Sequence, residues 1–276
     1  AIKVVAIKYF CVNIEKCERE NSVEQLVCRV SKYFKRQGIK QGYFNEEQSQ
    51  ILQDEIASIC LNQLAVFNSP VWFNVGIQEY DKTAGGVAPY KWDAESGMVL
   101  RSQKNEDRPQ CSACFILGMS DDIETIMEVQ NAEVMLFKGG SGAGSNRSAL
   151  RSSKEKLTGG GISSGPVAFM RGYDAYAGVI KSGGKTRRAA KMEILNMDHP
   201  DIVEFIEAKQ KEEKKAWALI EQGYSGGLNG EAYGSVFFQN SNMSVRASDE
   251  FMRAVRRNED WQTRFVKTGE VPVNKM

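Results

Sequence analysis

The sequence has a single histidine, almost no net charge and no apolar run long enough to cross a bilayer. One imidazole, His199, excludes a histidine-rich zinc or iron site and leaves His199 as the only base for a cysteine–histidine protease pair. A net charge of +1 gives no indication of nucleic-acid binding. The first ten residues lack a small-residue cleavage pattern, so we do not expect a signal peptide.

Cysteines are also few, and none follows Cys114; the six lie at positions 11, 17, 28, 60, 111 and 114. Such spacing in 276 residues is not typical of a secreted disulfide scaffold, so we expect reduced thiols in the cytoplasm. Cys111 and Cys114 form a C-x-x-C pair without a second pair to complete a zinc knuckle. Because the pair precedes an apolar strand, it favours one reactive thiol at a strand edge over a thioredoxin-type disulfide. The alternative is two buried small hydrophobic side chains.

The front of the chain is predicted to be a helical region over residues 1–66. Residues 1–10 read as a short strand, and two amphipathic helices follow, capped by Asn21 or Ser22 and by Asn45. We expect a loop at 68–74. Residues 80–109 are polar and lack periodicity, and therefore read as a long connection or a flexible insert.

The remainder, 67–276, alternates between strand and helix patterns, which predicts an α/β core. Strands are expected at 114–117, 192–197, 235–239 and 244–246. Helices are expected after Ser120, from 166, from 202 to about 222, and after Ser248. His199 precedes one of these helices and reads as a structural cap. Residues 212–215 read as an exposed helix face.

Glycine is concentrated in three stretches: KGGSGAGSNRSALR (138–151), TGGGISSG (158–165) and KSGGKTRRAAK (181–191). Glycine lets backbone approach a ligand closely, and free N–H groups beside Lys and Arg suit a phosphate. The first stretch lacks the lysine of a P-loop, so a flexible connection explains it equally well. The third could be a solvated basic face. Its paired glycines and alanines favour a loop that orders around a phosphate or a base.

In combination and in order, these segments resemble the adenosylcobalamin-dependent (class II) ribonucleotide reductases. The matching stretches are VAIKYF, FNSPVWFNVG, QCSACFIL, LFKGGSGAGSN, LRSSKEKLTGGGISSGPVAFMRG, GVIKSGGKTRRAAKM, DHPDIVEFIEAKQKEEKKA, NGEAYGSVFFQNSNMSVR and DEFMRAV. The resemblance implies a ten-stranded α/β barrel of two five-stranded halves, of which 67–276 is the first part, after the helical region 1–66.

The resemblance also implies a substrate site. Cys114 matches a cysteine of the redox pair that reduces the ribose 2′ carbon, and Ser112 matches the serine beside that ribose. Asn68, Ser69 and Gly142 fall in the substrate pocket. The implied partners are a ribonucleotide and a thioredoxin-type reductant, with adenosylcobalamin as cofactor of the complete enzyme.

A second implied site reads a deoxynucleotide or ATP effector at the interface of a homodimer. Asp121 and Ile123, at the start of a helix, match residues of this effector site. Arg151 matches a cation that binds the effector phosphate. The loop 182–190, with contacts through Lys185, Arg187 and Arg188, would carry information from the effector base to the substrate base.

The sequence departs from the family where the radical-bearing cysteine and the second redox cysteine are expected. We therefore expect a complementary chain or segment to carry them, and no turnover by this chain alone. Two alternatives remain open: a nucleotide-binding regulatory module without catalysis, and a related enzyme that uses a tyrosyl-radical subunit. The segments GGKTRRAAK and FNSPVWFN resemble the cobalamin-dependent enzymes more than the enzymes with a tyrosyl-radical subunit.

Overall fold

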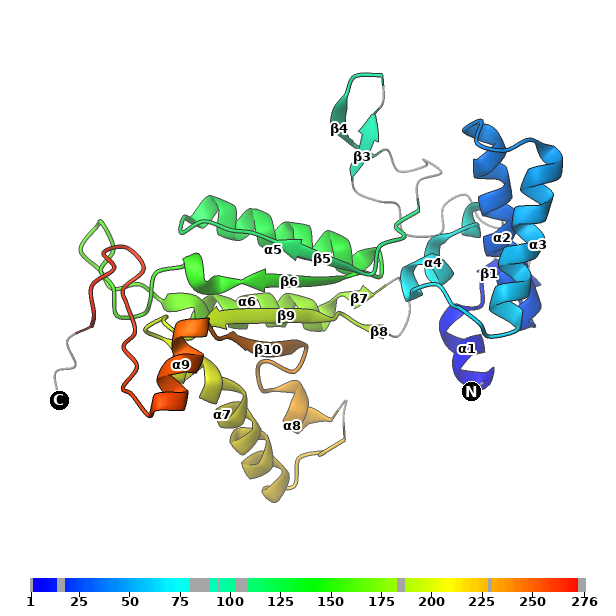
Figure 1. Cartoon of the computed structure of the whole chain (residues 1–276). Helices are drawn as coiled ribbons and strands as arrows, with labels where there is room; N and C mark the ends of the chain where they lie inside the picture. The colour runs from blue at the N-terminus through cyan, green and yellow to red at the C-terminus, as the bar shows by residue number, and fades with distance from the viewer. Residues whose placement is uncertain are drawn as a thin grey trace. The chain divides into compact units, whose positions relative to one another are not determined.

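The computed structural model divides the chain into two compact units (Figure 1). The first comprises residues 1–115, 135–142 and 181–187, and the second comprises 116–134, 143–180 and 188–276. The structure describes residues 2–13, 18–79, 90–93, 95–102, 109–182, 187–227 and 230–272. The boundary at residue 66 falls inside the first unit and stays a prediction.

Two amphipathic helices, α2 (Val23–Lys40) and α3 (Glu46–Leu61), form most of the helical part of the first unit. Both begin where the sequence predicts. The Ser22 hydroxyl accepts a hydrogen bond from the N–H of Gln25 at 3.1 Å. Asn45 and Gln48 form a capping box, in which each side chain accepts from the other residue's backbone N–H. The predicted start signals of both helices are therefore confirmed.

A helix, α1 (Ile2–Tyr9), occupies the start of the described chain, and the prediction of a strand there is wrong. The run of Ile and Val favours a strand locally, but tertiary packing overrides this preference. The ring of Tyr9 stacks on the ring of Phe73 with centroids 5.0 Å apart. A short antiparallel pair follows, β1 (Val12–Asn13) and β2 (Glu18–Arg19).

The predicted loop at 68–74 is instead a short helix, α4 (Ser69–Asn74), continued by the 3₁₀ turn η1 (Ile77–Glu79). Proline is tolerated in a first helical turn, and Pro70 occupies it here. Buried Arg29 satisfies the carbonyl end of α4 by donating to the carbonyl oxygens of Trp72, at 3.1 Å, and Val75. Its Nε lies 2.7 Å from the Glu20 carboxylate. This long-range cap explains why local sequence did not reveal the helix.

Within 80–109, the described residues form a hairpin of β3 (Tyr90–Asp93) and β4 (Met98–Arg101) instead of a featureless connection. Asp93 accepts hydrogen bonds from the N–H and hydroxyl of Ser96, at 2.9 and 2.6 Å. Gly97 takes a positive φ of 64° in the same turn. The expectation for residues 80–89, 94 and 103–108 lies outside the described residues.

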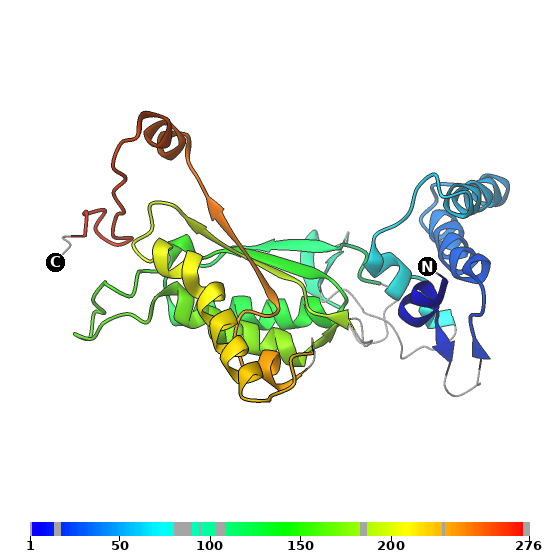
Figure 2. The same ribbon diagram turned by 90° about the horizontal axis from the view of Figure 1, so that it is seen from below.

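A four-stranded sheet in the order β10-β9-β6-β5 carries the predicted α/β core. Its strands are β5 (Cys114–Leu117), β6 (Gly142–Asn146), β9 (Lys191–Asn196) and β10 (Ser241–Arg246). β9 pairs in parallel with both β6 and β10. Because sequential parallel strands connect by right-handed crossovers, this order brings the connecting helices to one face. Figure 2 shows α6 and α7 together on one side of the sheet.

The connecting helices are α5 (Ile123–Lys138), α6 (Gly165–Val179) and α7 (Ile202–Glu221). Shorter elements complete the chain: η2 (Arg147–Ala149), β7 (Lys181–Ser182) paired with β8 (Arg187–Arg188), α8 (Glu231–Gly234) and α9 (Asp249–Arg257). Among the described residues, no helix is long and apolar enough to cross a membrane.

The core of the second unit lies between β9 and the helices α6 and α7. One cluster joins Met170 of α6, Leu195 of β9 and Phe205 of α7, all fully or almost fully buried. Phe238 also fills this cluster and has a positive φ of 63°. The strand predicted at 235–239 is therefore wrong: this segment is irregular and inserts an aromatic ring into the core.

Glu212 also departs from its prediction, because it is buried and not part of an exposed helix face. Its carboxylate accepts hydrogen bonds from the N–H of Phe237, at 3.2 Å, and from Lys215, at 2.6 Å. Burial opposes ionisation, but these two partners outweigh it and lower the pKa of Glu212. The acid therefore holds the segment before Phe238 against α7.

Candidate functional site

Cys114 is the first residue of β5. Among the five cysteines that the structure describes, it is the only exposed one. Cys111, three residues earlier, is half-buried and donates through Sγ to the carbonyl oxygen of Pro109 at 3.3 Å. Burial raises the pKa of the Cys111 thiol. The two cysteines thus differ: Cys111 is half-buried, whereas Cys114 is exposed to solvent.

The start of the first glycine-rich stretch lies beside this thiol strand. The hydroxyl of Ser141 donates to the carbonyl oxygen of Ser112 at 2.7 Å. The N–H of Gly142 donates to the carbonyl oxygen of Ala113 at 2.6 Å. The side chain of Ser112 is exposed, like that of Cys114. Ser112, Cys114 and Gly142 therefore share one edge of the first unit, and the N–H of Gly142 serves the backbone there.

Asn74, which sequence reasoning missed, joins α4 to this edge. Its buried amide donates to the carbonyl oxygens of Gln110 and Gly139, both at 2.8 Å. Asn68 and Ser69 begin the same short helix, where Asn68 is exposed and the Ser69 hydroxyl lies 3.1 Å from the Tyr9 hydroxyl. The second asparagine of FNSPVWFN was the available signal, because a buried amide in a helix of six residues requires partners outside it.

The structure brings together two of the predicted effector residues, Asp121 and Arg151. Arg151 donates through its backbone N–H to Asp121 Oδ1 at 3.0 Å and through Nε to Oδ2 at 2.6 Å. A second cation that sequence reasoning missed, Lys267, places its Nζ 3.1 Å from the same Oδ2. Burial opposes ionisation of Asp121, but the hydrogen bonds from Arg151 and Lys267 outweigh it and lower its pKa.

Ile123 is the first residue of α5, and 60% of it is exposed. The cap of this helix is Asp122, whose carboxylate accepts from the N–H of Thr125 at 2.9 Å, and not Ser120 as predicted. Ser120 donates its hydroxyl to Asp122 instead, and with Thr125 it lowers the pKa of Asp122 to about 2. An exposed apolar side chain therefore stands two residues from the Asp121 carboxylate.

The basic loop is described only at its ends. Lys185 lies outside the described residues, and Arg187 and Arg188 form β8, which pairs with β7. The downstream end is fixed: the N–H of Ala143 donates to the carbonyl oxygen of Ala190 at 3.1 Å. The next residue, Lys191, is buried at the start of β9.

His199 has a structural role, but the prediction that it caps the helix is wrong, because Asp201 is the N-cap of α7. Its Nδ1 accepts a hydrogen bond from the N–H of Asp201 at 3.0 Å, and its Nε2 lies 2.9 Å from the carbonyl oxygen of Leu150. The ring is buried. With both nitrogens engaged, His199 is not available as a base or as a metal ligand. No group of three or more metal-binding side chains occurs among the described residues.

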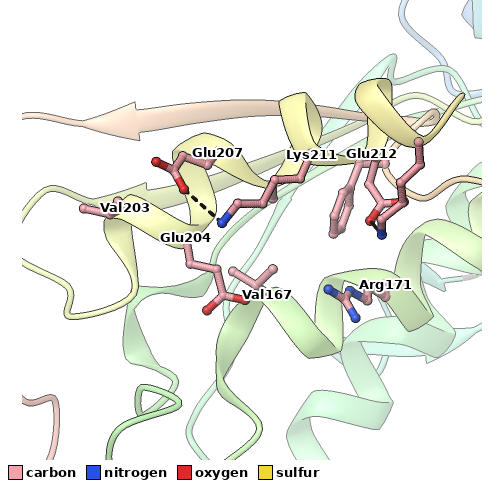
Figure 3. Close-up of a pocket in the computed structure, with 10 residues that line it drawn as sticks. Val167, Arg171, Val203, Glu204, Glu207, Lys211 and Glu212 are labelled. Atoms are coloured by element: carbon pink, nitrogen blue, oxygen red, sulfur yellow. Dashed lines mark hydrogen bonds and ion pairs between the residues drawn. The ribbon is translucent and has the colours of Figure 1, made fainter. Parts of the chain in front are cut away.

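A cavity of about 640 Å³ lies between α6 and α7 (Figure 3). Its lining combines acidic and basic side chains with the apolar residues Val167, Val203, Ala208 and Phe238. Lys211 and Glu207 in its wall form an ion pair of 2.9 Å. Figure 3 shows Arg171 of α6 on the opposite wall. The residues predicted from the sequence as site residues do not line this cavity.

Residues 112–274 match the family model described as the ribonucleotide reductase barrel domain. The chain therefore belongs to the ribonucleotide reductase family, as its resemblance predicted.

Within this family, the chain is similar to proteins that are named vitamin B12-dependent ribonucleotide reductases. The chain is 49% identical over 268 residues to a vitamin B12-dependent ribonucleotide reductase of Rhodopirellula baltica, covering 96% of this chain and 26% of that protein. It is 45% identical over 272 residues to the protein of that name from Streptomyces clavuligerus, covering 98% of this chain and 25% of the relative. It is also 48% identical over 107 residues to a vitamin B12-dependent ribonucleoside-diphosphate reductase of Thermoplasma acidophilum, covering 38% and 14%. The chain thus spans about a quarter of the first two relatives.

Proposed function

We propose that this chain is part of an adenosylcobalamin-dependent ribonucleotide reductase and supplies one redox cysteine, part of the substrate pocket and the effector site. The observation that carries the proposal is the exposed thiol of Cys114 at the start of β5, beside the glycine-rich start of β6. The similarity to proteins named vitamin B12-dependent ribonucleotide reductases supports the reaction type.

In this function Cys114 and a partner cysteine outside this chain donate two electrons and two protons to the ribose. The C2′ hydroxyl leaves as water, a hydrogen replaces it at C2′, and the two thiols become a disulfide. A thioredoxin-type dithiol then reduces that disulfide by exchange. Exposure of Cys114 suits this role, because its sulfur must reach both a substrate and a second thiol.

The cofactor would supply the radical that starts the reaction. Of the residues that the structure describes, the imidazole of His199 is already hydrogen-bonded at both nitrogens and does not fit as a cobalt ligand. We therefore assign cobalamin binding, and the radical-bearing cysteine, to a complementary segment or chain. The present chain would be inactive alone.

The second site would hold a deoxynucleoside triphosphate or ATP. Arg151 would pair with its phosphates, Asp121 would accept a hydrogen bond from the sugar, and exposed Ile123 would contact the base. The loop 182–190, through Lys185, Arg187 and Arg188, would transmit the identity of that base to the substrate pocket. Because the family's effector sites lie at a dimer interface, we propose a homodimer.

The test is reconstitution. The chain is mixed with a polypeptide that supplies the rest of the barrel, adenosylcobalamin, a dithiol reductant and a cytidine nucleotide, and formation of the 2′-deoxy product is followed. We expect Cys114→Ser to abolish reduction while effector binding is retained. Cys60→Ser, on α3, is the matched control and should stay active. Full activity of Cys114→Ser would refute the redox assignment.

A nucleotide-binding regulatory module is the second candidate. The Asp121–Arg151 pair favours it, because a nucleotide could bind these two residues without any redox chemistry. Effector binding without any reduction, even after complementation, would support this module and exclude the enzyme.

A further inference from the structure

Lys267 and Arg151 share a single carboxylate oxygen although 116 residues separate them in sequence. Arg151 Nε lies 2.6 Å from Asp121 Oδ2, and Lys267 Nζ lies 3.1 Å from the same atom. One acid thus faces two bases, and this trio has an excess of one positive charge. Such an excess favours a polyanion at the position where the two cations converge.

The backbone around Lys267 is fixed by hydrogen bonds. Its N–H donates to Glu155 Oε1 at 2.9 Å, and Glu155 Oε2 accepts from the N–H of Ser152 at 2.7 Å. A turn closes behind it, in which the N–H of Phe265 donates to the carbonyl oxygen of Glu270 at 2.8 Å. The C-terminal segment therefore presents Lys267 to the same loop that carries Arg151.

The two cations differ in access to solvent. The side chain of Lys267 is 51% exposed, whereas that of Arg151 is 17% exposed. A lysine ammonium is a compact charge on a flexible stem, so it can leave Asp121 and follow a phosphate group. Arg151 is held twice by Asp121 and has less freedom.

We infer that Lys267 is a second phosphate-binding residue of the effector site, directed at the outer phosphates of a nucleoside triphosphate. This inference rests on the proposed effector role of Asp121 and Arg151. On nucleotide binding, Lys267 transfers from Asp121 to the phosphate chain. The alternative is a structural ion pair that only fastens the C-terminal segment.

Equilibrium dialysis of the 276-residue chain with dATP, dGTP and dTTP tests this, together with the monophosphate of the tightest binder. We expect Lys267→Ala to weaken triphosphate binding about tenfold, equivalent to about 1.4 kcal/mol. Binding of the monophosphate should weaken less than about threefold in the same variant, because the monophosphate lacks the outer phosphates that Lys267 would contact. Lys267→Arg should retain triphosphate binding. Lys211→Ala is the matched control, since Lys211 is 58% exposed and also pairs with one acid.

Each other outcome overturns the inference in a distinct way. If Arg151→Ala loses triphosphate binding but Lys267→Ala does not, the effector site stands and Lys267 is only structural. Equal weakening of mono- and triphosphate by Lys267→Ala, with a lower melting temperature, also assigns a structural role. If the unaltered chain binds none of the three triphosphates, or Arg151→Ala binds as well as it does, the effector site itself is wrong.

Discussion

Arg147 and Glu193 meet at 2.5 Å, Nε to Oε2, with neither side chain exposed to solvent. They belong to a buried network that also includes Glu133 and Lys191. Glu133 lies 3.2 Å from Arg147 and 2.9 Å from Lys191, and Lys191 lies 2.8 Å from Glu193. The guanidinium of Arg147 also stacks over the ring of Tyr173, at 4.0 Å from its centroid. Two acids thus balance two bases in the interior of the second unit.

We predict that Arg147→Met destabilises the chain by about 3–5 kcal/mol, because it leaves two buried carboxylates with one cation. Burial disfavours a charged Arg147, but the carboxylates of Glu193 and Glu133 outweigh it and raise its pKa, so the charge is retained in the fold. Urea unfolding followed by circular dichroism measures the loss. The exposed Arg253 of α9 is the control: Arg253→Met should cost less than about 1 kcal/mol. Equal costs would show that the network contributes nothing beyond a surface pair.

This network shows why part of the fold was predictable and part was not. Strand alternation places Lys191, Glu193 and Leu195 on the same buried face of β9, and only Leu195 fits the usual expectation for such a face. A sequence gives no sign that a lysine and a glutamate there are paired, because one partner comes from α5 and another follows β6.

Local signals were reliable where the chemistry is local. Caps at Ser22, Asn45 and Ser248 and the strand at Cys114 are confirmed. Partners that are distant in the sequence could not be predicted from local signals. Arg29 of α2 donates to a carbonyl oxygen of α4, and Lys267 pairs with Asp121 from a segment without periodicity. The placing of Asp121 and Arg151 in one effector site came from the family resemblance, and the ion pair between them was not predicted.

A second prediction concerns thiol reactivity. Iodoacetamide should alkylate Cys114 at least several-fold faster than Cys111, because Cys114 is exposed whereas burial raises the pKa of the Cys111 thiol and lowers its thiolate fraction. Peptide mass spectrometry after timed labelling at pH 8 gives both rates in one sample. Cys60, whose pKa burial also raises, is an internal control and should react more slowly than Cys114. Faster labelling of Cys111 would contradict the exposed position of Cys114.

A third prediction follows from the lowered pKa of Asp121. A carboxyl with a lower pKa in the folded chain than in the unfolded chain binds fewer protons when folded. Its contribution to stability is therefore present above the ordinary pKa of 3.8 and is lost as pH falls through the lower folded value. Between pH 5 and 3, the melting temperature should fall less in Asp121→Asn than in the unaltered chain.

At pH 7 the same Asp121→Asn variant should melt about 2–4 °C lower, since the hydrogen bonds that Arg151 and Lys267 donate to this partly solvated carboxylate are weakened. Asp54→Asn is the control, because exposed Asp54 accepts only a surface hydrogen bond from Gln50. Parallel melting curves for Asp121→Asn and the unaltered chain across this pH range would rule out a stabilising role for the Asp121 carboxylate.

The last prediction separates two glycines of the same helix. Gly165 begins α6 with a φ of +73°, and a Cβ there would lie 2.7 Å from Asp201 Oδ2 and 2.8 Å from the Ser153 nitrogen. Asp201 accepts hydrogen bonds from the N–H and hydroxyl of Ser153, at 2.7 and 2.9 Å, so neither neighbour can move freely. Gly165→Ala should therefore destabilise the chain by about 2 kcal/mol or more, through backbone strain and overlap.

Gly172 lies in the interior of α6, where an added Cβ meets nothing within 4 Å. Gly172→Ala should stabilise the chain by about 0.5–1 kcal/mol, because alanine restricts the unfolded chain and favours helix. Urea unfolding of the two variants beside the unaltered chain gives the opposite signs directly. If both substitutions shift the midpoint in the same direction, the close packing of Gly165 against the Ser153–Asp201 pair is wrong, and with it the position of the loop that carries Arg151.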